Sequence, residues 1–274
     1  MRNTLAAVVL LSTAALAHGV SGFSRDFNGT SAGANPTLAE TGFSGAFNFD
    51  ASGLTLGGGT LTTRTLGGDS FGNFENDPDS AKNWLYNEVD VGAQTIATAR
   101  LTVSGLSENF HGGGIWMGTD QDHYVRMGVF HNSFIAGGPV AVEVLRENED
   151  RWGGATPPGQ GDDISGNATA VGALSVLPLD IILRITRTGN SVAGDYSLNG
   201  GTTFLPGGTF GGFALPGDPQ GLGSNTIESN TLKVGIYTAG GANASFAFDS
   251  LVVTPEPASL AALAMGGLLL RRRR

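Results

Sequence analysis

Residues 123–131 read HYVRMGVFH. Val125, Met127 and Val129 are apolar, and the residues between them are polar, aromatic or glycine. This period of two is typical of a β-strand that buries one of its faces. Residues 179–187, which read LDIILRITR, repeat the pattern. The two runs predict a protein built from sheets whose apolar faces pack against each other.

Short runs of the same kind recur along the chain, separated by glycine, asparagine and aspartate. They predict strands near residues 24–27, 46–49, 61–64, 84–91, 95–103, 114–117, 123–131, 140–146, 179–186, 191–197, 203–205, 232–239 and 245–253. Residues 147–172 and 206–230 carry no strand signal, so we expect long loops there. No confident helical period occurs between residues 18 and 254. The fold class is therefore all-β, as a two-sheet antiparallel sandwich or a closed barrel.

The composition excludes several classes of function. The chain has 274 residues with 44 Gly, no Cys and a formal charge of −9. Without cysteine there are no disulfides, thiolate metal sites or cysteine nucleophiles. We expect no nucleic-acid partner, because phosphate binding needs a basic face and the sequence pI is about 4.8.

The N-terminus has the pattern of a secretory signal. Arg2 precedes an apolar run over residues 5–17 that ends in Ala15-Leu16-Ala17. A basic head, a short apolar run and a small-x-small exit are typical of a signal peptide. We therefore expect residues 1–17 to direct export and to be cut off before His18; a buried N-terminal helix is the alternative.

The C-terminus combines three features in order: Pro255-Glu256-Pro257, an apolar run over residues 260–270, and Arg271-Arg272-Arg273-Arg274. As a helix the run is about 17 Å long, short of the roughly 30 Å hydrocarbon core. The arginines would stay on the cytoplasmic side. This tail resembles the PEP-CTERM sorting signal. The resemblance implies processing by an exosortase of a Gram-negative bacterium, with transient anchoring in the inner membrane and then location at the cell surface or outside the cell.

The two ends leave a body over residues 18–254, followed by the sorting segment over residues 255–274. Removing the five arginines and one glutamate of the ends leaves a net charge of about −13 on the body. Such a surface repels anionic polymers unless divalent cations mediate the contact. The partners we expect are the exosortase, the export machinery, the membrane before processing and an extracellular polysaccharide.

Three stretches give the body a family resemblance. Residues 113–128 contain GGIWM and DHYVRMG, residues 183–197 run from LRITR to YS, and residues 234–253 contain VGIY and FAFDSLVV. Together they resemble the concanavalin A-like lectin/glucanase jelly roll. The resemblance implies that the first strand pairs beside the last, and the family includes lectins, glycosidases and adhesive modules.

The spacing of the carboxylates in the sequence argues against a catalytic function. Retaining glycosidases of the concanavalin A-like family, which the body resembles, carry Glu-x-Asp-x-(x)-Glu on one strand, and this spacing places the carboxylates on one face. Glu88-Val89-Asp90 supplies the first two, but Gly92 and Ala93 occupy the candidate positions for the third. No Gly-x-Ser-x-Gly motif accompanies the histidines. We therefore expect a protein that is not an enzyme, with a secreted glycoside hydrolase or lyase as the alternative.

A polysaccharide-binding face is the favoured functional hypothesis. If the alternating apolar residues face the core, the opposite face presents aromatic and charged side chains: Trp116, Tyr124, Arg126, Glu143, Arg184 and Tyr237. Aromatic rings stack on the C–H faces of sugars, and charged groups bond to their hydroxyls. Trp152, in the acidic stretch after residue 146, is a further contact candidate. An ordinary outer sheet face, with Glu143 paired to Arg126 or Arg184, is the alternative.

Calcium is the one cofactor that the sequence leaves open. Asp77 with Asp79, and Asp120 with Asp122, place oxygen ligands at alternate positions, which suits a hard cation. Asp120 and Asp122 fit a hairpin turn equally well. The sequence thus predicts an exported, non-catalytic, lectin-like protein that requires no cofactor; a purely structural envelope protein is a further alternative.

Overall fold

The structure is a computed structural model that describes residues 22–28, 33–68, 80–121, 123–131, 133, 139–148, 165–170, 177–189, 191–210, 230–241 and 243–256. The expected signal peptide (residues 1–17) and the apolar run over residues 260–270 lie outside these residues. Among the described residues, no helix is both long enough and apolar enough to span a bilayer.

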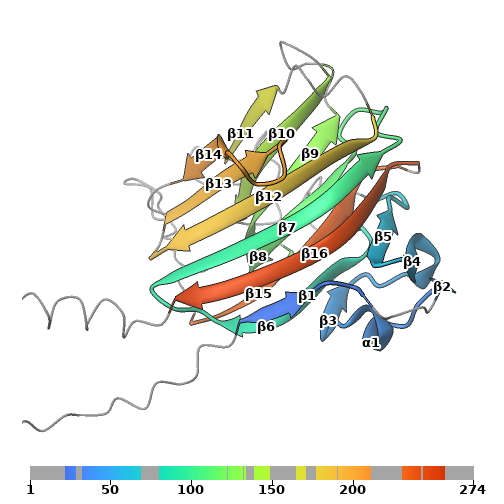
Figure 1. Ribbon diagram of the computed structural model, residues 1–274, viewed down its shortest axis with the longest axis horizontal. Helices are drawn as coiled ribbons and strands as arrows, with labels where there is room; N and C mark the ends of the chain where they lie inside the picture. Colours follow the sequence, from blue (N-terminus) through green and yellow to red (C-terminus); the bar gives the residue numbers. More distant parts are fainter. Residues whose placement is uncertain are drawn as a thin grey trace, which may run out of the picture.

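Two antiparallel sheets stack face to face (Figure 1). Sheet A has the order β14-β13-β12-β7-β16-β5-β4-β2, and β1 also pairs with β16. Its strands are β1 (Phe23–Arg25), β2 (Gly33–Ala34), β4 (Leu54–Gly57), β5 (Thr60–Arg64), β7 (Gln94–Ser104), β12 (Leu179–Thr188), β13 (Ser191–Ser197), β14 (Leu205–Phe210) and β16 (Ser245–Glu256).

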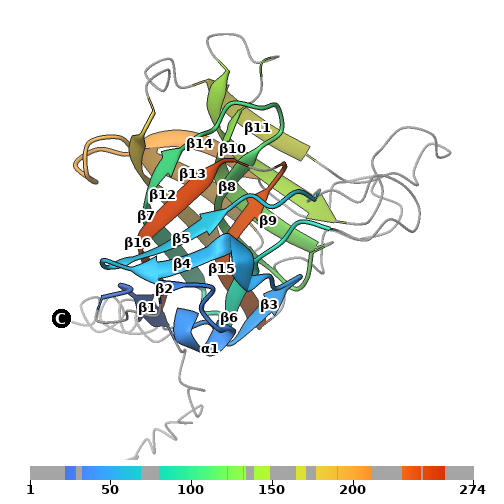
Figure 2. The same cartoon turned by 90° about the vertical axis from the view of Figure 1, so that its right-hand side faces the viewer.

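Sheet B has the order β11-β10-β9-β8-β15-β6-β3. Its strands are β3 (Gly45–Phe47), β6 (Trp84–Asp90), β8 (Gly112–Gly118), β9 (His123–His131), β10 (Val140–Asn148), β11 (Ser165–Ala170) and β15 (Thr231–Ala239). The short helix α1 (Leu38–Thr41) lies beside β3 and β6 (Figure 2), and η1 (Ala51–Gly53) precedes β4. The all-β, two-sheet prediction is confirmed.

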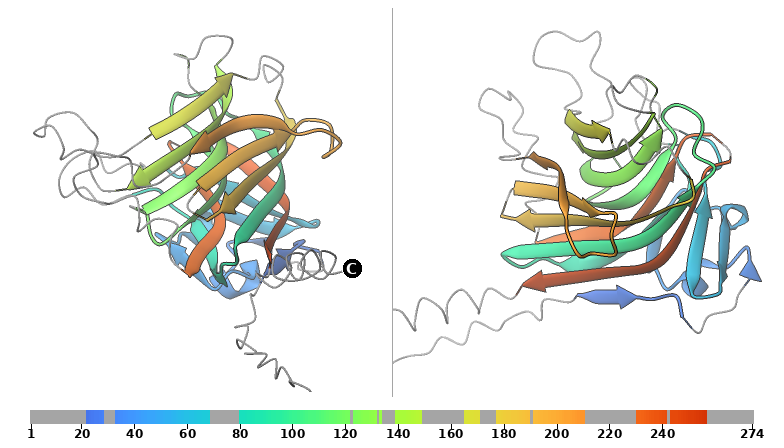
Figure 3. Two further views of the ribbon diagram at one scale, coloured as in Figure 1. Left: turned by 90° about the vertical axis from the view of Figure 1, so that its left-hand side faces the viewer. Right: turned by 45° about the horizontal axis from the view of Figure 1, so that its top comes forward.

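The main hydrophobic core lies between the two sheets, which form separate layers (Figure 3). The alternating apolar positions of the sequence fill it as predicted: Ile115, Met117, Val125, Met127, Val129, Val140, Val142, Val144, Ile181, Leu183, Ile185, Val234 and Ile236. Leu179 is half-buried at its margin. Because strands of period two bury one face, the opposite face of sheet B is free to carry other side chains.

Several elements correct the sequence prediction. β11 lies inside the predicted loop over residues 147–172, and β14 begins at Leu205 and continues through Phe210, inside the predicted loop over residues 206–230. β11 reads SGNATA and pairs with β10 at the edge of sheet B. Polar and small residues there carry no alternating pattern, so periodicity could not identify the strand. The short β2, β4 and α1 were likewise not predicted.

The two ends of the described body lie together. Phe23 pairs with Val253, so the first strand runs beside the last, as the resemblance implied. β16 continues through Pro255 and Glu256, which pair with Thr95 and Gln94 of β7. Two residues of the expected sorting signal therefore belong to the sheet, while Pro257 and Arg271–Arg274 lie outside the described residues.

Candidate functional site

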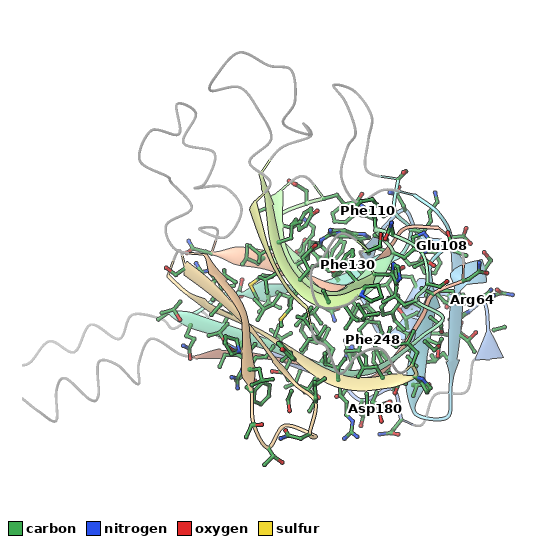
Figure 4. The ribbon with its side chains drawn as sticks, turned by 90° about the horizontal axis from the view of Figure 1, so that it is seen from above. Arg64, Glu108, Phe110, Phe130, Asp180 and Phe248 are labelled. Atoms are coloured by element: carbon green, nitrogen blue, oxygen red, sulfur yellow. The ribbon has the colours of Figure 1, made fainter. Side chains whose placement is uncertain are left out.

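The outward positions of sheet B carry a second hydrophobic cluster, here called the outer cluster. Its buried members are Ala81, Trp84, Trp116, Tyr124, Phe130, Leu145, Tyr237 and Ala239, with Phe47 and Tyr86 partly buried against them. Figure 4 shows Phe130 and Phe110 on this side of the sandwich, Phe248 between the sheets and Asp180 on the far side. Strand alternation thus brings Trp116, Tyr124 and Tyr237 together as the sequence predicted.

Trp84 lies at the centre of the outer cluster. Its ring centroid is 5.2 Å from that of Trp116, 4.8 Å from that of Tyr124 and 5.1 Å from that of Tyr237. Such edge and tilted arrangements stabilise aromatic clusters beyond simple burial. Trp84 was not among the predicted site residues, although its place two residues before Tyr86 on a predicted strand puts it on the same face.

The rings of the outer cluster are not an open platform. Trp116, Tyr124 and Tyr237 are all 0% exposed, and Arg126 is 1% exposed. A sugar cannot stack on a ring without accessible surface. The expectation that these side chains form an exposed sugar-binding surface is therefore wrong for the structure described.

A glycine lets Trp116 lie close to the sheet. Gly235 of β15 lies between Trp116 and Tyr86 in the strand register. A Cβ added at Gly235 would lie 1.7 Å from the carbonyl oxygen of Leu85. With that space free of a side chain, the indole Nε1 of Trp116 donates to the same carbonyl at 3.4 Å.

Arg126 and Glu143 form an ion pair within this aromatic surrounding. Arg126 Nη2 lies 3.3 Å from Glu143 Oε1, and the Glu143 side chain is 17% exposed. The guanidinium carbon is 4.6 Å from the ring centroid of Phe130 and 5.3 Å from that of Tyr237. Cation–π contacts of this geometry help to hold a desolvated arginine. Of the two pairings open for Glu143, the structure has the one with Arg126.

Tyr237 has a buried hydroxyl. No hydrogen-bond partner for its Oη occurs in the described part of the chain. Burial raises the pKa of Tyr237 well above its usual range. The hydroxyl is therefore neutral at ordinary pH, and it lies inside the cluster instead of facing solvent.

A hydrogen bond joins two parts of sheet B that are far apart in strand order. Asn48, just after β3, donates through Nδ2 to Gln121 Oε1 in the turn after β8, at 3.4 Å. β6 and β15 separate β3 from β8 in the sheet, so this contact requires the sheet to curl strongly. Asn48 also donates to the carbonyl oxygen of Ala81.

One margin of the outer cluster reaches solvent. We call it the Tyr86 edge and define it as Phe47, Tyr86, Glu88 and Lys233. The rings of Phe47 and Tyr86 are half-buried, with centroids 5.1 Å apart. Lys233 Nζ lies 5.5 Å from the Tyr86 centroid and 5.8 Å from that of Phe47. Burial, and then the charge of Glu88, raise the pKa of Tyr86.

The Tyr86 ring is positioned by a second glycine. A Cβ on Gly45 of β3 would lie 2.4 Å from Tyr86 Cζ, so the ring rests on the neighbouring strand. Phe49, two residues past β3, is itself 39% exposed. This edge was not predicted from the sequence; the signal that could have found it is the alternation of Tyr86 and Glu88 on one predicted strand.

Arg184 does not belong to this face. It lies on β12 of sheet A, where it pairs with Asp195 at 3.0 Å and stacks 3.8 Å above the ring of Phe204. Period-two alternation assigned its face correctly but could not tell which sheet carries it. Trp152 lies outside the described residues.

Of the four aspartates predicted to bind calcium, one lies within the described residues. Asp77, Asp79 and Asp122 lie outside the described residues, and Asp120 lies in the turn after β8. Within the residues that the structure describes, no three His, Cys, Asp or Glu side chains are placed to hold a metal ion. Calcium binding stays a prediction.

Comparison with solved structures places this sandwich among known folds. A functionally unknown protein from Saccharomyces cerevisiae has 15% sequence identity and a TM-score of 0.54, with 77% of this chain and 96% of that chain covered. The GH43 protein BlXynB from Bacillus licheniformis has 17% identity and a TM-score of 0.51, covering 76% of this chain and 36% of that one. GH43B from the Bacteroides ovatus xyloglucan PUL has 13% identity and a TM-score of 0.52, covering 86% of this chain and 40% of that one.

These likenesses define a fold. The chain spans well under half the length of the two GH43 proteins. No protein-family model matches the sequence, and no curated protein matches it. The class that the fold and site define is thus a two-sheet antiparallel β-sandwich with an aromatic outer face.

The comparison also corrects one expectation. The sequence led us to expect a protein that is not an enzyme, because one glucanase motif lacks its third carboxylate. Similar solved structures include GH43 proteins, and GH denotes glycoside hydrolase. The sandwich therefore occurs within hydrolases, and the missing carboxylate of a different motif does not exclude catalysis.

Proposed function

We propose that this chain is a carbohydrate-active protein that binds a polysaccharide at the Tyr86 edge. The observation that carries the proposal is the half-buried pair of aromatic rings, Phe47 and Tyr86, beside the charged groups of Glu88 and Lys233. The likeness to GH43 proteins favours the same class of ligand.

The chemistry of the edge suits a sugar ring. A pyranose has C–H groups that pack on an aromatic face, and hydroxyl groups at its rim that need donors and acceptors. Tyr86 and Phe47 supply the aromatic surface, while the exposed Glu88 carboxylate accepts hydrogen bonds. The rings are held by Gly45 and the outer cluster, so little ordering is needed on binding.

Affinity electrophoresis in gels that contain soluble polysaccharides tests the proposal. Tyr86→Ala should remove most of the retardation seen with the natural chain, in a panel that includes arabinoxylan and mixed-linkage β-glucan. Phe204→Ala is the matched control, because Phe204 is also a half-buried aromatic beside a cation but lies just before β14, next to Arg184 of sheet A. Equal retardation of the natural chain and Tyr86→Ala would contradict the proposal.

Cleavage of the bound polysaccharide is a second candidate. Glu88 and Asp90 are exposed on one face of β6, and residues two apart on a strand are about 7 Å apart. This is the spacing of the Cα atoms; inverting glycosidases use two carboxyl groups about 6.5–9.5 Å apart as acid and base. Release of reducing ends that is lost in Glu88→Gln, while binding persists, would establish hydrolysis; no release from any polymer of the panel would contradict it.

We also propose that the body is a concanavalin A-like jelly roll that is exported and processed by an exosortase. The order of the tail, Pro255-Glu256-Pro257 followed by an apolar run and four arginines, supports this. Fractionation of cells that express the chain with and without residues 257–274 tests it. The shortened chain should escape processing and change its location; an unchanged location and size would contradict the proposal.

A further inference from the structure

We propose that the Tyr86 edge selects neutral polysaccharides and rejects polysaccharides that carry carboxylates. This inference rests on the proposed function of the edge. Two observations support it: the negative charges near the rings of Phe47 and Tyr86, and the contacts that already occupy the ammonium group of Lys233.

Carboxylates dominate the open side of the edge. Glu88 and Asp90 point outward from β6, and both are exposed. Asp120 lies in the turn after β8, next to Thr119, whose carbonyl oxygen contacts Lys233. A sugar acid placed on the rings would therefore approach several negative charges, whereas the same sugar without its carboxylate would approach acceptors for its hydroxyls.

The cation of the edge is already engaged. Lys233 lies opposite Glu88 in the register between β15 and β6. Its Nζ donates to the carbonyl oxygen of Thr119 at 2.6 Å and lies over the faces of Tyr86 and Phe47. An incoming carboxylate would have to displace these contacts to bind the ammonium group, so Lys233 is a poor anchor for an acidic sugar.

The other nearby charges do not reverse this balance. The charge of Lys82, the other lysine of the chain, adds to the lowering of the pKa of Asp50, after the larger effect of the hydrogen bonds from Ser52. Arg126 is buried and paired with Glu143. The body as a whole has a net charge of about −13, which adds a long-range repulsion of anionic polymers.

Two matched pairs of polymers test the selectivity. Arabinoxylan is compared with glucuronoxylan, and mixed-linkage β-glucan with the same glucan oxidised to carboxylates at its primary hydroxyls. In low salt with EDTA, we expect the neutral member of a pair to bind about tenfold more tightly than the carboxylated member. This difference in affinity, here called the gap, should narrow when added salt shortens the Debye length. Glu88→Gln should narrow the gap too. Asp180→Asn is the charge-matched control, because Asp180 lies on the far face of the sandwich (Figure 4), and it should leave the gap unchanged.

The outcomes separate this inference from the proposed function. Equal or tighter binding of the carboxylated member of a pair at low salt, in EDTA or with added Ca²⁺, would overturn the selectivity and leave polysaccharide binding intact. Binding of none of the four polymers would overturn the proposed function, and the selectivity with it. An equal effect of Glu88→Gln and Asp180→Asn would show repulsion by total charge and would overturn the assignment to the edge.

Discussion

Tyr237→Phe should stabilise the protein. The substitution removes the Oη atom and keeps the ring, which contacts Trp84, Phe130 and the guanidinium of Arg126. Tyr237 is 0% exposed, and its hydroxyl has no hydrogen-bond partner among the described residues. Because the hydroxyl gives up its hydration on folding and no described residue bonds to it, its burial is a cost that phenylalanine avoids.

The magnitude follows from the cost of leaving a buried polar group unpaired. Mutational data place that cost at about 1–3 kcal/mol. We expect the free energy of unfolding to rise by about 1 kcal/mol, which corresponds to an increase in Tm of about 2–4 °C for a domain of this size. Tyr196→Phe is the control, because the hydroxyl of Tyr196 is not among the buried unpaired groups and its removal should bring no gain.

The same variant should change the response to alkaline pH. Burial raises the pKa of Tyr237 in the folded state, whereas an unfolded tyrosine ionises near pH 10. The contribution of Tyr237 to the free energy of unfolding is therefore constant below about pH 10 and falls as the pH rises above it. The reason is that the unfolded chain then releases a proton that the folded chain retains. Tyr237→Phe should flatten this decline.

Urea unfolding at neutral pH, and thermal melts between neutral and alkaline pH, measure both effects. A loss of more than about 1 kcal/mol in Tyr237→Phe would show that the hydroxyl has a stabilising partner and would refute the reasoning. Affinity for polysaccharide should not change, because the hydroxyl lies inside the outer cluster. A large loss of binding in a stable variant would mean that the buried rings meet the ligand.

Three further predictions concern packing and the end of the fold. Glu143→Ala should lower the free energy of unfolding by about 3 kcal/mol, because it removes the carboxylate that pairs with the buried charge of Arg126; urea unfolding measures this, and a change below about 1 kcal/mol would contradict it. Gly45→Ala should weaken polysaccharide binding by displacing the Tyr86 ring, and gel retardation equal to that of the natural chain would show that the ring position does not matter. A chain that ends at Glu256 should melt like the full chain, whereas one that ends three residues earlier should melt lower because it loses the last pairs with β7; equal melting would place the end of the folded strand earlier.

The alternation of apolar and other residues predicted the sheets well, because a strand with one buried face buries every second side chain. Val125, Met127 and Val129 of β9 face the main core, and the residues between them face outward. The same period of two places Trp116, Tyr124, Arg126 and Tyr237 on one face of sheet B. This part of the site follows from local geometry alone.

Exposure could not be predicted in the same way. Whether an outward ring meets solvent depends on how strongly the sheet curls, and here a hydrogen bond joins Asn48 to Gln121 across two intervening strands. Sheet membership is also invisible to alternation, so the sequence grouped Arg184 with Arg126 although Arg184 lies on the other sheet. The edge strand β11 has the sequence SGNATA, and backbone pairing with β10 defines it instead of a hydrophobic pattern.

Locating the bound polysaccharide on the surface tests the proposed function most directly. Hydroxyl-radical footprinting of the natural chain, with and without saturating neutral polysaccharide, reports the solvent accessibility of individual aromatic side chains. Binding at the Tyr86 edge predicts protection of Phe47 and Tyr86 on sheet B and unchanged labelling of Phe204, which lies just before β14 of sheet A. Protection of Phe204 with unchanged labelling of Phe47 and Tyr86 would contradict it.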